Sequence, residues 1–139
     1  MADTADIVVV GGGVHGASTA WHLAKRGAGK IVLIEKDGIA SGDSGWSSAI
    51  VRMHYSLESL VKVTMYGREM YGDWKNIVGV GESGFRQVGF LVLFPEDEVA
   101  HGRDVVEMQQ RLGIDARYIS VDEVGEIEPR LVRDDVAAG

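Results

Sequence analysis

The chain lacks several features that define large classes of protein. Among its 139 residues there is no cysteine, and there are only two prolines. The absence of cysteine excludes disulfides, thiolate nucleophiles and cysteine-ligated metals. The four histidines, at positions 15, 22, 54 and 101, show no metal-ligand spacing. We therefore expect no metal site.

Long apolar runs are also missing. No stretch approaches the roughly 20 apolar residues that a membrane-spanning helix needs. The early apolar run over 7–14 contains glycines and follows acidic residues without a base, unlike a secretory signal. We therefore expect a cytoplasmic protein with no transmembrane segment.

Basic charge is scarce. The net charge is −7, and residues 95–139 hold 12 acids against 5 bases, whereas residues 1–94 hold 9 of each. A chain without a basic cluster has no electrostatic footprint for nucleic acid, and anionic membrane surfaces should repel it. The 45% of hydrophobic and 25% of charged residues are typical of a globular protein. No nucleic-acid partner is expected.

Glycine, by contrast, is abundant, with 19 residues. The β-branched run IVVV at 7–10 predicts a buried parallel strand, and Gly11–Gly16 follows it directly. A helix is predicted from Val14 to about residue 26, where glycines end it, and IVLIE at 31–35 predicts a second buried strand. This order of strand, glycine turn, helix and strand is typical of an α/β dinucleotide-binding βαβ unit.

The glycine turn carries the strongest motif. Gly11 permits a tight turn, Gly13 lets the backbone approach a pyrophosphate, and Gly16 lets the helix pack closely on the strand. The free N–H groups and the dipole at the helix N-terminus favour phosphate. The predicted phosphate-binding residues are Gly11, Gly12, Gly13, Val14, His15 and Gly16.

An acidic residue ends the second predicted strand. Glu35 lies 24 residues after Gly11, where a carboxylate can hold ribose hydroxyls. We include Lys36 beside it in the predicted cofactor site. A carboxylate there repels a 2′-phosphate and argues against NADP. The motif alone leaves NAD and FAD open, but the serine- and glycine-rich loop GIASGDSGWSS at 38–48 can offer hydroxyl and N–H groups to a long cofactor.

The remainder of the chain predicts further helices and strands. Residues 36–48 are expected to form a loop, and residues 49–55 fit a strand or the start of a helix equally. Later elements are a helix over 57–78, a strand over 88–94, a helix over 96–112 capped by Gly113, a short strand over 117–119, and a last helix opened by Ser120 and Glu123 and ended by Pro129. We predict an N-terminal part of a cofactor domain over 1–55 and the start of an incomplete α+β substrate domain over 56–139.

These motifs resemble those of a known family. Three further segments carry the resemblance: ASGDSGWSSAIVRMHY at 40–55, RQVGFLVLF at 86–94 and LGIDARYISVDEVGEIEPRL at 112–131. The chain is similar to the N-terminal part of D-amino-acid-oxidase-type FAD-dependent oxidoreductases, particularly the sarcosine oxidase and dimethylglycine dehydrogenase group. The resemblance implies an FAD enzyme that oxidises a C–N bond of a small amine or amino acid, such as sarcosine or glycine, by hydride transfer to flavin. Members of the family are much longer. We therefore expect a fragment, inactive alone, that needs a C-terminal part or a partner subunit.

The resemblance also implies roles for residues. In relatives, Arg52 corresponds to an arginine that faces the substrate carboxylate, although an ion pair with Glu58 or Asp43 is the alternative. Trp46 is followed by Ser47, where relatives with covalent flavin have histidine, so non-covalent FAD is expected within this segment. The loop residues implied to lie along the flavin side of the cofactor are Ser41, Ser44, Gly45, Ser47 and Ser48.

Other functions stay open at this point. No catalytic residue is assigned, and His54 near Arg52 is either a packing residue or a residue of the active site. A related FAD enzyme for a 2-hydroxy acid or glycerol 3-phosphate has the same motifs. So do an NAD-dependent dehydrogenase and a non-catalytic ADP-binding fragment.

Overall fold

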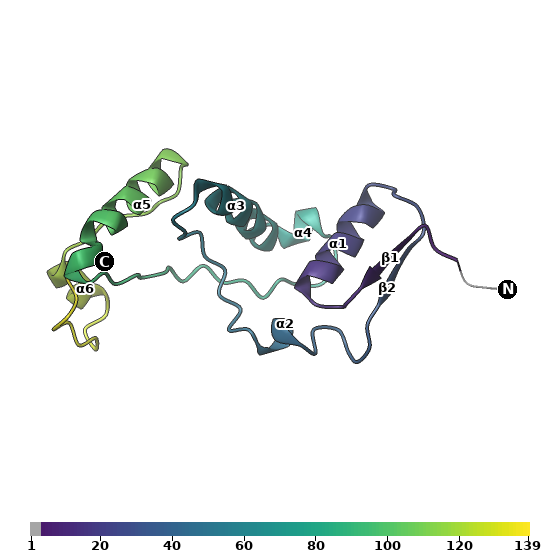
Figure 1. Ribbon diagram of the computed structural model, residues 1–139, viewed down its shortest axis with the longest axis horizontal. Helices are drawn as coiled ribbons and strands as arrows, with labels where there is room; N and C mark the ends of the chain where they lie inside the picture. Colours follow the sequence, from purple (N-terminus) through teal and green to yellow (C-terminus); the bar gives the residue numbers. More distant parts are fainter. Residues whose placement is uncertain (1–3) are drawn as a thin grey trace. The chain divides into compact units, whose positions relative to one another are not determined.

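A computed structural model describes residues 4–139 and divides the chain into two compact units, the first ending at Ile50 and the second formed by Val51–Gly139 (Figure 1). In the part of the chain that is described, no helix is long and apolar enough to cross a membrane.

The first unit is built around a βαβ arrangement. Strand β1 (Ile7–Val10) pairs in parallel with β2 (Ile31–Ile34), with Ile7 opposite Ile31. Helix α1 (Val14–Lys25) connects the strands and packs against both (Figure 1). Side chains of β1 alternate between half-buried and exposed positions, as the period of a strand requires. The predicted dinucleotide-type βαβ unit is confirmed.

The predicted loop after β2 contains one helical turn. Helix α2 (Asp43–Trp46) begins after Gly42, whose carbonyl oxygen accepts hydrogen bonds from the N–H groups of Gly45 and Trp46. Asp43 places negative charge at the N-terminus of this turn, where the helix dipole favours it. The prediction of an irregular loop over 36–48 was therefore wrong at these four residues.

The predicted helix over 57–78 is two helices in the second unit. Helix α3 (Glu58–Gly72) and helix α4 (Trp74–Ile77) are separated by Asp73, whose backbone is not helical, with φ −116° and ψ 36°. Residues 49–55 belong to neither a helix nor a strand, so both expectations for that segment were wrong.

The predicted strand over 88–94 was wrong as well. The segment makes a single isolated bridge, between Phe94 and Ala138, and Val88 is 87% exposed. Gly89 has φ +87°, which interrupts the extended backbone that a strand needs. The predicted strand over 117–119 was also wrong, because the isolated bridge with Ala138 is formed by Ser120, the residue after this segment.

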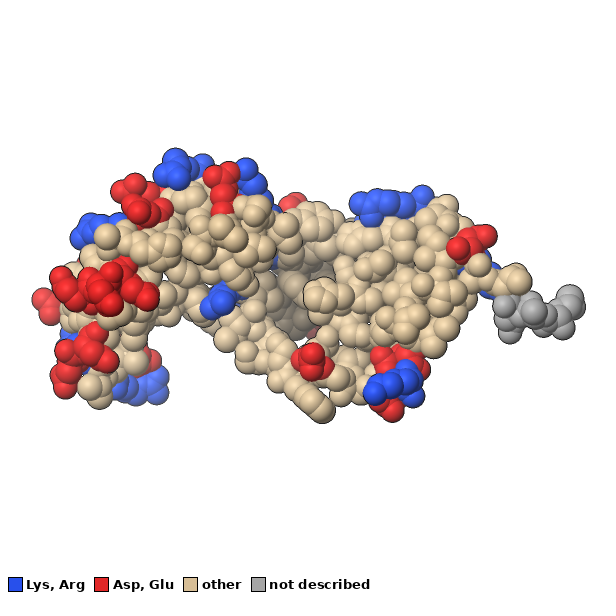
Figure 2. Space-filling view, viewed as in Figure 1, with Lys and Arg blue, Asp and Glu red and all other residues tan. Residues whose placement is uncertain are grey.

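The C-terminal helices follow the sequence signals closely. A 3₁₀ turn, η1 (Glu96–Glu98), leads into α5 (Val99–Arg111), and Gly113 follows the helix end with φ +84°. The capping box that opens α6 (Val121–Ile127) is present: the Glu123 N–H donates to Ser120 Oγ at 3.3 Å, and the Ser120 N–H donates to Glu123 Oε2 at 2.7 Å. Acidic side chains gather over this part of the chain (Figure 2).

The core of the second unit joins α3 to α5. Val61 of α3 is fully buried with Val105 and Met108 of α5. Half-buried apolar side chains surround this cluster, and they are Tyr55, Met65, Leu112 and Ile114. Burial of such side chains contributes about 1.5–3 kcal/mol each, so this cluster fixes the segment that contains Tyr55.

Candidate cofactor-binding site

The glycine turn is held between β2 and α1. The Gly11 N–H donates to the Ile34 carbonyl oxygen at 2.7 Å, which ties the turn to the end of β2. Gly11 has φ +104°, in the region that only glycine adopts easily. Gly13 is the N-cap residue of α1 and offers no side chain to its first turn. The N–H groups of that turn have no partners within the helix, which is the arrangement that suits an anion.

Gly16 is the most tightly constrained residue of the motif. A Cβ atom built on Gly16 would overlap the Gly11 carbonyl oxygen, and it would lie 3.6 Å from Val9 Cγ1. A Cβ on Gly13, by comparison, would lie 3.0 Å from Ser44 Oγ, which is a side-chain atom and not part of the backbone. Close approach of α1 to the turn and to β1 therefore requires glycine at position 16.

Glu35 is bound to the glycine turn itself. Its Oε2 accepts a hydrogen bond from the Gly12 N–H at 2.7 Å, and its Oε1 accepts one from the Asp37 N–H at 3.0 Å. These bonds, the Gly12 bond first, lower the pKa of the Glu35 carboxyl. The group is therefore a carboxylate at neutral pH, and each oxygen has acceptor capacity left for a ribose hydroxyl. Lys36 beside it forms an exposed ion pair with Asp37 at 3.7 Å.

The serine- and glycine-rich loop folds back onto the turn. The Ala40 N–H donates to the Gly12 carbonyl oxygen at 3.0 Å, and Ala40 has φ +60°, which is uncommon for a residue other than glycine. Ser44 Oγ accepts a hydrogen bond from the Val14 N–H at 2.9 Å, at the N-terminus of α1. Neither contact was predicted. They place the Ser44 hydroxyl where the sequence predicts a phosphate to bind.

The remaining loop residues divide into one constrained position and several exposed ones. A Cβ on Gly45 would overlap the Ala40 carbonyl oxygen, so glycine is required there. Within the described residues, Ser41, Ser47 and Ser48 are exposed and form no hydrogen bond with the glycine turn. His15 is exposed in the first turn of α1. The roles of these residues stay predictions.

Arg52, in the second unit, lies over aromatic rings. Its guanidinium carbon is 5.1 Å from the ring centroid of Tyr55 and 5.7 Å from that of Phe90. Arg52 forms no ion pair with Glu58, which binds Lys62 at 2.6 Å. Among the residues that the structure describes, Arg52 forms no ion pair with a carboxylate.

His54 is half-buried and pairs with a buried polar side chain. Its Nδ1 lies 3.1 Å from the Nε2 of Gln109, a residue only 3% exposed on α5. An amide N–H is a donor, so Nδ1 is the acceptor and the ring proton is on Nε2. Burial, together with the charges of Arg52 and His101, lowers the pKa of His54. His54 is thus neutral at neutral pH and ties the Arg52 segment to α5.

This pair predicts a loss of stability in mild acid. The folded-state pKa of His54 lies below its ordinary value of 6.5, so the unfolded chain takes up a proton first as the pH falls. The contribution of neutral His54 to the free energy of unfolding is complete above pH 6.5 and is lost as the pH falls through the folded-state pKa. Asparagine keeps an acceptor for Gln109 but does not titrate, so His54→Asn should reduce the fall in unfolding free energy between about pH 7.5 and 5.5. Urea unfolding at both pH values measures this fall, with His15→Asn, at an exposed histidine of the first unit, as the control. Equal falls for wild type and His54→Asn would contradict the assignment.

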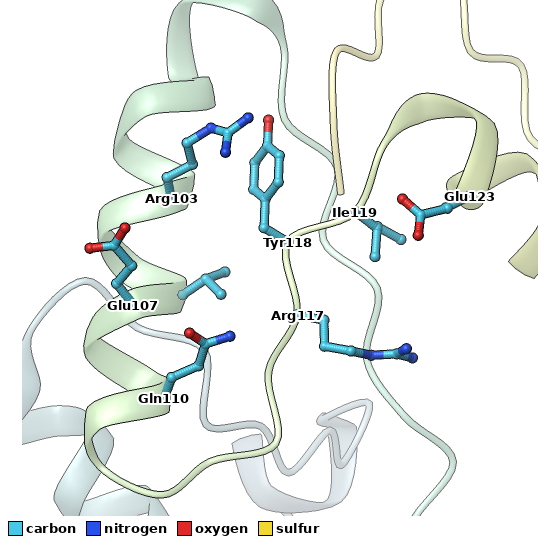
Figure 3. A pocket seen from close by; sticks show the side chains of 8 residues that line it. Arg103, Glu107, Gln110, Arg117, Tyr118, Ile119 and Glu123 are labelled. Carbon is cyan, nitrogen blue, oxygen red and sulfur yellow. The ribbon is translucent and has the colours of Figure 1, made fainter.

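A separate pocket of about 360 Å³ lies within the second unit, between α5, the segment before α6 and α6 itself (Figure 3). The guanidinium of Arg103 lies 3.9 Å from the ring centroid of Tyr118, and Glu107 and Glu123 also line the pocket. None of the predicted site residues lines it.

Comparison with protein families decides the assignment of the chain. Residues 6–139 match the family described as FAD dependent oxidoreductase. The chain belongs to this family. FAD is therefore its cofactor, and the predicted resemblance to the sarcosine oxidase and dimethylglycine dehydrogenase group is confirmed, because proteins with both names are among the relatives. The family match covers a range of residues and does not identify the individual residues that bind FAD.

Individual relatives are much longer than this chain. It is 29% identical to 4-methylaminobutanoate oxidase (formaldehyde-forming) of Paenarthrobacter nicotinovorans, over 88% of this chain and 15% of that protein. It is 30% identical to the mitochondrial pyruvate dehydrogenase phosphatase regulatory subunit of Mus musculus, over 91% of this chain and 14% of that protein. The crystal structure of L-proline dehydrogenase from P. horikoshii matches with a TM-score of 0.84 and 31% identity, over 99% of this chain and 36% of that one. The chain thus spans between a seventh and somewhat over a third of these proteins.

Proposed function

We propose that the chain forms the ADP-binding part of a flavoenzyme that oxidises the C–N bond of a small amine or amino acid. The observation that carries the proposal is the convergence of Gly12, Glu35 and Ser44 at the N-terminus of α1. When bound, the cofactor supplies the redox chemistry, which is acceptance of a hydride from the carbon next to the substrate nitrogen. The names of the relatives, an amine oxidase and an amino-acid dehydrogenase, support this class of substrate.

The residues present fit the ADP half of FAD. The glycine turn, from Gly11 to Gly16, would hold the pyrophosphate with backbone N–H groups and the dipole of α1. Glu35, already ionised and fixed by Gly12, would accept hydrogen bonds from the adenosine ribose. Ser44 supplies a hydroxyl at the same helix terminus, and its rotation would free the Val14 N–H for a phosphate oxygen. The attachment is non-covalent within this chain.

Arg52 would bind the carboxylate of the substrate. Two features support this role: the guanidinium has no carboxylate partner among the described residues, and it rests on rings that leave its N–H donors free. Its planar fork suits two oxygens of one carboxylate. Residues beyond this chain, from the same polypeptide or a partner subunit, would complete the flavin and substrate sites. A cytoplasmic location is also part of the proposal.

The test uses the contact of Glu35 with ribose. Glu35→Gln keeps one oxygen for the Gly12 N–H but loses the charge and one acceptor. A hydrogen bond to a charged group contributes about 1.5–3 kcal/mol, so we expect FAD affinity of the reconstituted apoenzyme to fall by roughly tenfold or more. Affinity for FMN, which has no adenosine ribose, should not change. Asp37→Asn is the matched control on a neighbouring carboxylate. An unchanged FAD affinity, or a colourless protein that binds NADH, would contradict the proposal.

A second candidate is a flavin-binding module without turnover. It is favoured by the relative that is named a regulatory subunit, which matches over 91% of this chain. Such a module would bind FAD with the same dependence on Glu35, but amine or amino-acid substrates would not reduce the flavin. Loss of the flavin absorbance under anaerobic conditions on addition of N-methylglycine or proline separates the two candidates.

A further inference from the structure

The guanidinium of Arg52 lies against two aromatic rings and forms no ion pair among the described residues. Its carbon lies over Tyr55 at 5.1 Å and over Phe90 at 5.7 Å, both within the range of about 6 Å in which a cation is attracted to a ring face. Cation–π contact uses the face of the guanidinium and no hydrogen-bond donor. The N–H groups therefore stay available for a planar anion.

The ring of Tyr55 has a fixed position. Tyr55 packs against the buried cluster of Val61, Val105 and Met108, which joins α3 to α5. Its neighbour His54 is bound to buried Gln109 of α5 at 3.1 Å. The ring is thus held against the buried cluster of the second unit, and a group resting on the ring gains a defined position.

The segment that carries Phe90 is anchored at Phe94. Phe94, four residues later, is 5% exposed, and a Cβ on Gly102 of α5 would lie 2.9 Å from its ring. The Phe94 N–H donates to the Ala138 carbonyl oxygen at 2.9 Å. Phe90 itself is 48% exposed, so packing within the second unit leaves much of its ring uncovered. The sequence pattern does not predict the contact between Phe90 and Arg52, which the structure shows.

We propose that Tyr55 and Phe90 are positioning residues that hold the Arg52 guanidinium in place for the carboxylate of the substrate. This inference rests on the proposed role of Arg52. The two rings fix the orientation of the guanidinium without occupying its donors, whereas an acidic partner would compete with the substrate. Binding then loses less side-chain entropy, because the fork is ordered before the carboxylate arrives.

The experiment measures affinity for acetate, the simplest carboxylate, in the flavin-loaded enzyme from the change in flavin absorbance. Tyr55→Leu and Phe90→Leu should each weaken acetate binding by roughly two- to fivefold, the range expected for one exposed cation–π contact. Tyr55→Phe and Phe90→Tyr keep the rings and should recover the affinity. In turnover, the leucine variants should raise KM for N-methylglycine with little change in kcat, and should leave KM for N-methylethylamine, which has no carboxylate, as it is. Thermal unfolding of each variant checks that the fold is intact.

A double-mutant cycle separates failure of this inference from failure of the Arg52 role. In an Arg52→Ala background, Phe90→Leu should have no further effect on acetate affinity. An equal loss in both backgrounds, or no loss in either leucine variant while Arg52→Ala weakens binding, overturns the positioning role alone. If Arg52→Ala binds acetate as tightly as wild type, the proposed substrate role fails and the positioning role fails with it.

Discussion

Replacement of Gly16 by alanine is expected to remove flavin from the enzyme almost completely. The added methyl group would overlap the Gly11 carbonyl oxygen, a backbone atom that cannot rotate away. Either α1 or the glycine turn must then move, and both form the predicted pyrophosphate site. Overpacking of this kind costs about 1–3 kcal/mol of stability. We expect at least a tenfold loss of bound FAD and a lower free energy of unfolding, measured by absorbance and by urea titration.

Gly67→Ala is the matched control. Gly67 lies inside α3 of the second unit, and a Cβ there would meet no atom within 4 Å. Alanine in a helix interior is favoured over glycine by about 0.5–1 kcal/mol, so this variant should be more stable and should retain its flavin. A Gly16→Ala enzyme with stoichiometric FAD would show that the close approach of α1 to the turn is not needed for binding.

The sequence predicts the βαβ unit well because its signals are local. The run IVVV, the glycines at 11, 13 and 16 and the helix end near Gly27 all depend on neighbours within a few residues. The capping box of Ser120 and Glu123 is predicted for the same reason, since its two bonds join residues three apart. Each of these features follows from backbone conformation and hydrogen bonding within one turn or strand.

Features that depend on distant partners were predicted poorly. The apolar segment 88–94 has the composition of a strand, but pairing needs a neighbouring strand, and among the described residues only Phe94 finds one, at Ala138. The contact between Ser44 and Val14 spans 30 residues and depends on how the loop turns at Ala40. Nothing in the sequence indicates a positive φ at an alanine, so the contact of this loop with α1 was not predicted. Only its contact with the cofactor was.

For Arg52, too, the sequence suggested the chemical role, whereas the neighbouring residues are known only from the structure. Its residue type and its place after the loop suggested a carboxylate ligand, through resemblance to sarcosine oxidases. The structure adds what surrounds it, namely two rings and no acidic partner among the described residues. Those surroundings make the substitution by lysine informative, because lysine preserves the charge and changes everything else about the group.

Arg52→Lys is expected to lower kcat/KM for N-methylglycine by roughly 10- to 100-fold, which corresponds to the loss of one hydrogen bond to a charged group, about 1.5–3 kcal/mol. Lysine keeps the positive charge, but its ammonium cannot bind two carboxylate oxygens in one plane and cannot stack flat on Tyr55 and Phe90. Flavin content should not change, because the predicted ADP site lies in the first unit. Kinetics with N-methylethylamine should show a much smaller loss, since that amine has no carboxylate.

Arg111→Lys on the last turn of α5 is the matched control for this substitution, because Arg111 is exposed and has no role in the proposed site. It should leave both substrates unaffected. Equal losses for N-methylglycine and N-methylethylamine in Arg52→Lys would mean that the arginine supports the fold or the flavin and does not bind a carboxylate. A loss confined to the carboxylate substrate would mean that the fork itself recognises it. Because charge is constant in the comparison, electrostatic steering cannot account for that selectivity, which must come from the planar guanidinium, through its paired hydrogen bonds and its position on the two rings.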